Sequence, residues 1–176
     1  MNLVPEAAVE PVSFDELVAS SGRRLLRLAL MLSGSLHTAE DLVQTVLVRA
    51  YRHWDRVAAA DRPEAYLRRM VVNEFLSWRR RMTSREVPVA ELGDVPGVED
   101  ASTRQAQRDA MWRLLALLPR QQRVVLVLRY YEDLPDSEIA AVLGCSPSTV
   151  RSNAARALAS LRSGVPGLDT DTEALP

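Results

Sequence analysis

The chain has 176 residues, enough for one or two small domains, and its 47% hydrophobic content is that of a globular protein. Cys145 is the only cysteine, which excludes an intrachain disulfide and a cysteine-based metal site. The formal net charge is −1, the N-terminus lacks a signal peptide's basic and apolar parts, and no apolar run approaches the ~18 residues of a membrane span, so we expect a cytoplasmic protein without membrane contact.

Charged residues are segregated along the chain. All 22 cationic side chains are arginine, whose planar guanidinium suits phosphates and base edges, although a GC-rich genome would favour arginine equally. Residues 23–82 carry twelve arginines against six acids (+6), and residues 104–163 carry nine against five (+4). The segments 1–22, 83–103 and 164–176 are acidic. Two basic blocks between acidic segments indicate two domains that face a polyanion.

The first predicted element is a helix that begins near Ser13. Residues 1–12 hold two prolines among acids and are expected to be disordered. Apolar residues then recur at helical spacing until the sequence "SGS" at 33–35 ends the helix.

A second helix is predicted to run to Trp54. Thr38 followed by Asp41 resembles a capping box and marks its start. Residues 55–61 are expected to form a loop, and Pro63 suits the first turn of a third helix, "PEAYLRRMVVNEFLSWRRRM". Apolar positions three or four residues apart form the inward stripe of the second helix: Ala39, Leu42, Val43, Val46, Ala50 and Trp54.

Residues 83–103 have the composition of a linker. They hold two prolines, two glycines and five acids, and could span about 70 Å if fully extended. Helices are predicted to resume at 104–118 and 120–131. The run "RVVLVLRYY" is β-branched enough to resemble a strand, but its helical neighbours argue against one.

The predicted fold class is therefore all-α, with two small helical domains joined by a flexible linker. The sequence leaves open whether the two domains dock on each other. The predicted division is a disordered N-terminus (1–12), a first domain (13–82), an acidic linker (83–103), a second domain (104–163) and an acidic tail (164–176).

The stretch "PDSEIAAVLGCSPSTVRSNAARALASLR" predicts two helices separated by a tight turn. The first covers about 136–143 and ends at Gly144, which adopts a positive φ at little cost. Ser146 then offers an N-cap oxygen, and Pro147 occupies the first helical position. This pattern is typical of a helix-turn-helix, although a helical hairpin that only packs is the alternative.

The outward face of the second of these helices favours DNA. It combines small residues, which permit close approach to a groove, with arginines, and no acid occurs between Cys145 and Gly167. We therefore expect this helix to enter the major groove. Its outward residues are Ser148, Ser152, Ala155, Arg156 and Ala159, with Thr149 and Arg151 on the flanks.

Two longer segments resemble a known family. "LPRQQRVVLVLRYYEDLPDSEIAAVLGCSPSTVRSNAARALASLR" resembles region 4 of the extracytoplasmic-function (ECF, group IV) sigma factors, and "AEDLVQTVLVRAYRHW…RPEAYLRRMVVNEFLSWRRR" resembles their region 2. "AEDLVQT", "VVNEFLSWRRR" and "VVLVLRYYEDL" are similar to the actinobacterial SigE-type subfamily. The resemblance implies a protein that binds core RNA polymerase and directs it to particular promoters.

The resemblance also implies roles for individual residues. Region 2 would bind the clamp helices of the largest polymerase subunit through Asp41, Leu42, Val43 and Gln44, and region 4 would contact the flap region. Leu42 and Val43 also fit the core, which makes Asp41 and Gln44 the better contact candidates. Residues expected at the promoter −10 element are Arg56, Arg62, Asn73, Arg79, Arg80 and Arg81.

In region 4, the family pattern assigns the −35 element to Ser148, Thr149, Arg151, Ser152 and Arg156. Asn153 stands where a cation is common, Ala155 where a larger residue often packs on DNA, and Pro135 replaces the usual Ser or Thr cap. In region 2, Phe75 and Trp78 could stack on bases, but their spacing is more typical of core residues.

Other functions fit the sequence less well. An enzyme is not expected, because the chain has no phosphate-binding glycine loop and only two histidines, and we expect neither cofactor nor small-molecule ligand. A stand-alone helix-turn-helix regulator would need a sensor or dimerisation domain, and an anti-sigma factor would need a membrane span or a zinc motif. Only 164–176 follow the second domain, so we expect control by a separate protein, such as an anti-sigma factor, or by expression level.

Overall fold

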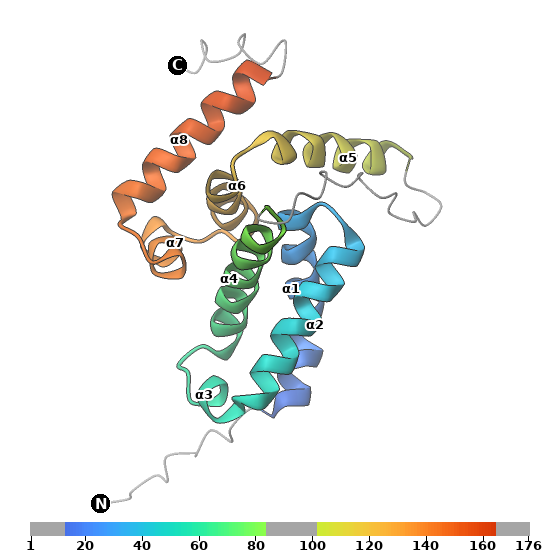
Figure 1. The fold of residues 1–176 in the computed structure, drawn as a ribbon, viewed down its shortest axis with the longest axis vertical. Coiled ribbons are helices and arrows are strands. Elements are labelled where there is room, and N and C mark those ends of the chain that lie inside the picture. Colours follow the sequence, from blue (N-terminus) through green and yellow to red (C-terminus); the bar gives the residue numbers. More distant parts are fainter. Residues whose placement is uncertain (1–12, 84–101, 165–176) are drawn as a thin grey trace, which may run out of the picture.

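A computed structural model describes residues 13–83 and 102–164, with side chains placed for 13–77 and 110–163. All regular structure in these ranges is helical (Figure 1), which confirms the all-α prediction. The predicted disordered N-terminus and most of the predicted linker and tail lie outside the described residues. The elements are α1 (Phe14–Ser33), α2 (Leu36–Arg52), α3 (Trp54–Ala58), α4 (Pro63–Thr83), α5 (Ser102–Leu117), α6 (Arg120–Leu126), the π-helical turn η1 (Val127–Tyr131), α7 (Asp136–Leu143) and α8 (Pro147–Gly164).

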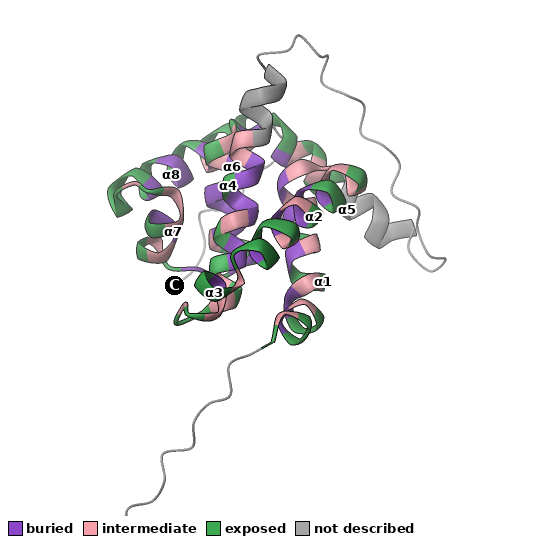
Figure 2. Cartoon of the chain, turned by 60° about the horizontal axis from the view of Figure 1, so that its bottom comes forward, coloured by how far each residue is buried: buried purple, intermediate pink, exposed green. Residues whose placement is uncertain are grey.

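The N-terminal unit is a bundle of α1, α2 and α4, with α3 packed at one end (Figure 1). Buried residues line the inward faces of the helices (Figure 2), and among the described residues Phe75 is the largest side chain that is fully buried. Arg49 of α2 forms an ion pair with the buried carboxylate of Glu74 on α4. This pair joins two helices of the bundle.

The first helix begins where the sequence predicted. The Ser13 hydroxyl accepts a hydrogen bond from the backbone N–H of Glu16, and the Glu16 carboxylate accepts one from the backbone N–H of Ser13. This reciprocal capping box satisfies backbone donors that the helix itself cannot pair. The hydrogen bond from the Ser13 backbone lowers the pKa of Glu16 below its ordinary value.

Two predictions for the second helix are wrong. Helix α2 begins at Leu36, capped by the Ser35 hydroxyl, so the start falls before the predicted Thr38 pair. The chain also ends α2 at Arg52 and forms the short helix α3 within the predicted loop 55–61. Trp54 is only partly buried, because it begins α3 and packs edge-on against Phe14 of α1. The other five residues of the predicted stripe are buried.

The C-terminal unit contains α5, α6, η1, α7 and α8. The ambiguous run "RVVLVLRYY" is helical, as predicted, but its last five residues form a π-helical turn. Asp133 follows with a positive φ of 53°, a conformation that aspartate tolerates better than most residues. The π turn and Asp133 together redirect the chain between α6 and α7.

The predicted helix-turn-helix is present in α7 and α8. Gly144 ends α7 with a φ of 64°, and the Ser146 hydroxyl accepts a hydrogen bond from the Thr149 backbone at 3.2 Å. Pro147 is the first residue of α8, where its missing N–H costs nothing. Val150, Ala154 and Ala157 are buried and face the rest of the unit.

Replacing Gly144 by alanine should lower the free energy of unfolding by ~1–2 kcal/mol, because an L residue is strained at this φ. A Cβ atom at this position would meet nothing within 4 Å, so the cost comes from the backbone alone. Gly22 provides the matched control. It lies inside α1, where an added Cβ makes an ordinary 3.8 Å contact with Val18, so Gly22→Ala should stabilise by roughly 0.5–1 kcal/mol. Chemical denaturation measures both changes, and equal effects would contradict this account.

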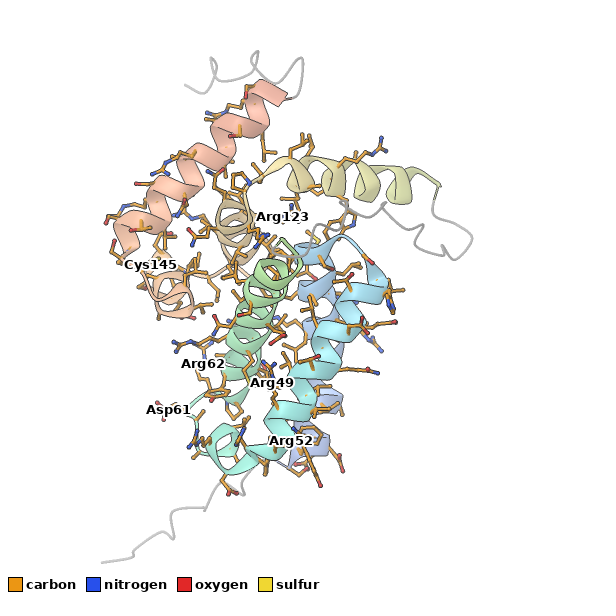
Figure 3. All side chains as sticks on the ribbon, viewed as in Figure 1. Arg49, Arg52, Asp61, Arg62, Arg123 and Cys145 are labelled. Carbon is orange, nitrogen blue, oxygen red and sulfur yellow. The ribbon has the colours of Figure 1, made fainter. Side chains whose placement is uncertain are left out.

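The two units are docked on each other, which answers the question that the sequence left open. Helix α1 packs against η1, and α4 packs against α6 and α7. Arg123 of α6 lies near the centre of the molecule, where the units meet (Figure 3). Across the described helices, none combines the length and apolar character needed to cross a membrane.

Candidate nucleic-acid interface

Helix α8 packs against α6 and α7 and lies at the outside of the molecule (Figure 1). Val150, Ala154 and Ala157 are buried on its inner side, and the predicted outward and flanking residues are all exposed. Small side chains alternate with arginines on this face, which leaves room for close approach to a groove floor. The exposed residues are Ser148, Thr149, Arg151, Ser152, Ala155, Arg156 and Ala159.

An ion pair holds the start of the helix-turn-helix in place. Arg129 of η1 hydrogen-bonds to Asp136 in the first turn of α7, and this bond raises the pKa of the Arg129 guanidinium above its ordinary value. Arg151 of α8 lies 4.0 Å from the second Asp136 oxygen and keeps 63% of its side chain exposed. Asp136 therefore positions α7 without withdrawing Arg151 from solvent.

Asn153, which stands where the family commonly has a cation, does not lie on the outward face of α8. Asn153 is only 9% exposed, because it faces the interior beside Val150 and Ala154. A missing cation at this position therefore removes nothing from the outward face of α8. Ala155 is exposed, as the outward face requires.

A second polar stripe runs along α4 on the side of the C-terminal unit. Arg62 donates to Glu138 of α7 at 3.4 Å, and Asn73 shares a cavity of about 420 Å³ with residues of α6 and α7. Tyr66 and Arg69 are exposed between them at spacings of three and four residues, and they were not among the predicted site residues. The spacing from Arg62 to Asn73 was the signal that could have identified them.

The remaining −10 candidates are less closely grouped. Arg56 is exposed on α3, beyond the start of α4. Phe75 is fully buried in the bundle, so the alternative that it stacks on a base is wrong. The side chains of Trp78, Arg79, Arg80 and Arg81 lie outside the described residues.

Helix α2 carries a third surface opposite its buried face. Asp41 is 64% exposed and lies 3.6 Å from His37, and Gln44 is exposed. Leu42 and Val43 are in the core, so Asp41 and Gln44 are the two of the four predicted polymerase-contact residues whose side chains are exposed.

Two apolar side chains extend the α2 surface. Val48 is 53% exposed and Tyr51 is 67% exposed, and both follow Asp41 and Gln44 at helical spacing. Tyr51 was not among the predicted contact residues, and its ring also packs edge-on against Phe14, with ring centroids 5.2 Å apart. An exposed apolar stripe beside polar residues is suited to a partner helix.

Within the described residues, these surfaces define a class of protein: two helical units, the second of which exposes a helix-turn-helix of the kind that binds DNA. The family model "Sigma-70 region 2" matches residues 17–85, and "Sigma-70, region 4" matches residues 108–161. The chain therefore belongs to the sigma-70 family of RNA polymerase sigma factors, in its extracytoplasmic-function group.

Relatives and solved structures agree with this assignment. The RNA polymerase sigma-E factor of Streptomyces avermitilis is 40% identical, over 94% of this chain and 92% of that protein. The ECF sigma factor SigM of Mycobacterium tuberculosis is 31% identical, over 90% and 80%. The sigma factor RpoE of Bartonella quintana, solved with the anti-sigma factor NepR, superimposes with a TM-score of 0.70 at 25% identity, covering 85% of this chain and 94% of that one.

The resemblance to sigma-E-type factors is thus confirmed. The protein is an alternative sigma factor, which binds core RNA polymerase and directs it to specific promoters. The stand-alone regulator is not favoured, because both matched regions occur in the order of a sigma factor.

Proposed function

We propose that the two units divide promoter recognition between them. Helix α8 enters the major groove at the −35 element, with Arg151, Ser152 and Arg156 at base edges and Ser148 and Thr149 near the phosphates. The observation that carries this proposal is the outward face of α8, on which every one of these side chains is exposed. Exposed arginine among small residues is the combination that major-groove readout uses.

The stripe on α4 serves the −10 element. Asn73 offers both a donor and an acceptor to an unstacked base, and Tyr66 offers a ring on which a base can stack. Arg56, Arg62, Arg69 and the arginines at 79–81 bind phosphates. The exposure of Tyr66, Arg69 and Asn73 on one side of α4 supports this assignment.

The α2 surface binds the clamp helices of the largest polymerase subunit. Asp41 and Gln44 supply polar contacts, and Val48 and Tyr51 supply apolar area that the bundle itself leaves exposed. Region 4 contacts the flap region of the polymerase. A protein that acts on this enzyme works where the chromosome lies, in the cytoplasm.

An anti-sigma factor is the regulatory partner that we propose. The sigma factor RpoE of Bartonella quintana was solved in complex with such a protein, NepR. In this chain, a cavity of about 660 Å³ opens between the two units and is lined from both, by Arg24 and Arg62 on one side and Pro135 and Glu138 on the other. A cleft of this kind offers a helix contacts with both units at once.

Asn73→Ala should reduce discrimination at a single −10 base by roughly 1–3 kcal/mol, because a base-specific contact is lost. Arg69→Ala provides the contrast: a phosphate contact is lost, so transcription should fall about equally on all promoter sequences. Competition between promoter variants in a purified transcription assay measures both effects. Uniform losses in both variants would contradict base reading by Asn73.

A further inference from the structure

We infer that the free protein is held in a closed, self-masked state by an ionic latch centred on Glu132. The latch joins the end of η1 in region 4 to α1 and α4 of region 2. It holds α6 and α7 beside Arg62 and Asn73, where they obstruct the approach of a nucleotide to the −10 side of α4 until the two units separate. The masking part of this inference rests on the proposed role of α4, whereas the latch itself rests on the structure alone.

The latch is a buried charge cluster between units that are far apart in sequence. The Glu132 side chain is 1% exposed and lies 3.0 Å from the Arg68 guanidinium, whose side chain is 8% exposed. Arg24 of α1 lies 3.0 Å from the same carboxylate oxygen and is half exposed. Removing one partner from such a cluster leaves a buried charge uncompensated, so the docked arrangement depends strongly on Glu132.

The local backbone conformation directs the Glu132 side chain toward Arg24 and Arg68. The π-helical turn η1 closes with a hydrogen bond from the Glu132 backbone to Val127, and Asp133 then takes its positive φ. The Leu134 backbone donates to Leu128 at 3.0 Å, which completes the turn. An ordinary helical turn would rotate the residue at 132 to a different direction, and single π turns often occur at functional positions.

A second tie joins the same two units. The buried guanidinium of Arg123 on α6 donates to the carbonyl oxygen of Leu32, at the end of α1, at 2.9 Å. It also donates to Ala116 at the end of α5 at 3.0 Å. A cation at two helix C-termini satisfies carbonyls that the helices leave unpaired and complements both helix dipoles. Arg123 therefore supports the interface that Glu132 closes.

The closed arrangement keeps the two reading surfaces too close together for a promoter. Asn73 of α4 and Leu143 of α7 line one cavity, and α8 begins only four residues after Leu143, at most about 14 Å of chain. The −10 and −35 elements lie about 25 base pairs apart, or roughly 85 Å of B-DNA. Both surfaces can engage their elements together only after the units separate.

Glu132→Gln in the full chain tests the latch, with Glu138→Gln as the matched control. Glu138 also pairs across the interface, with Arg62 at 3.4 Å, but this pair is far more exposed than the Glu132 cluster, at 65% for Arg62 and 41% for Glu138. We expect small-angle X-ray scattering to give a larger radius of gyration for Glu132→Gln and an unchanged one for Glu138→Gln. A single-stranded −10 oligonucleotide should bind Glu132→Gln at least about tenfold more tightly, because apparent affinity rises with the fraction of open protein.

Arg24→Glu is a second variant that distinguishes opening of the interface from misfolding of the protein. Arg24 is half exposed on α1, so its replacement leaves the bundle core intact while placing a carboxylate against Glu132. It should open the protein as Glu132→Gln does, with unchanged helical content by circular dichroism. An unchanged radius of gyration in both variants would overturn the latch, and opening without tighter oligonucleotide binding would overturn the masking. If no form binds the oligonucleotide, the −10 assignment fails, and the latch is judged on scattering alone.

Discussion

Replacing Asp41 and Gln44 together by alanine should abolish promoter-specific transcription while the protein stays folded. Both side chains are exposed on α2 and lie on the face opposite its buried stripe. If each supplies an interface contact of about 2 kcal/mol, the double variant loses roughly a thousandfold in polymerase affinity. Stability should change by no more than about 0.5 kcal/mol, since both side chains are exposed and the contact that Asp41 gives up, to His37, is exposed as well.

The measurement is a titration of core polymerase with labelled protein, followed by transcription with the same preparations. Asp15→Ala is the matched control, because it removes an exposed carboxylate from a different helix of the same unit. It should bind polymerase like the unaltered protein. Wild-type transcription by the double variant would show that the polymerase-docking site is not on this face of α2.

Arg156→Ala should cost ~1–3 kcal/mol of promoter discrimination, or about five- to 150-fold, if its guanidinium reads a base in the −35 element. The residue is exposed on the outward face of α8, so the free energy of unfolding should change by less than about 0.5 kcal/mol. The loss should be confined to one base position. Such a pattern distinguishes base reading from a general loss of positive charge.

Arg162→Ala is the control for Arg156, since it removes the same charge from the last turn of the same helix. We expect it to weaken transcription uniformly or not at all. Competition between promoters that differ at single −35 positions measures both variants. Unchanged discrimination in Arg156→Ala would remove this arginine from the reading face.

Local sequence patterns predicted the parts of the site that a single helix or turn determines. The positive φ of Gly144, the Ser146 cap and the outward face of α8 all follow from residues within one turn of each other. The start of α2 was misplaced because two residues, Ser35 and Thr38, could each have capped this helix. Ser35 is the N-cap, and its hydroxyl accepts a hydrogen bond from the backbone N–H of Thr38.

Local sequence patterns could not predict contacts between segments that are far apart in the sequence. Glu132 lies 108 residues from Arg24, and no helical periodicity indicates that the two meet. The π turn before Glu132 continues the β-branched and aliphatic run of α6 without a glycine or proline to mark a change, so local sequence patterns did not indicate it. Asn73 was predicted as a DNA contact, but its place beside α6 and α7 depends on this docking.

The most direct test of the central claim is run-off transcription of fragmented genomic DNA from the source organism, with purified core polymerase and sequencing of the transcript 5′ ends. The protein should create a discrete set of start sites that share two upstream sequence elements, one near −10 and one near −35. The Asp41→Ala, Gln44→Ala double variant should create none of them. Start sites identical with and without the protein would contradict its assignment as a promoter-directing sigma factor.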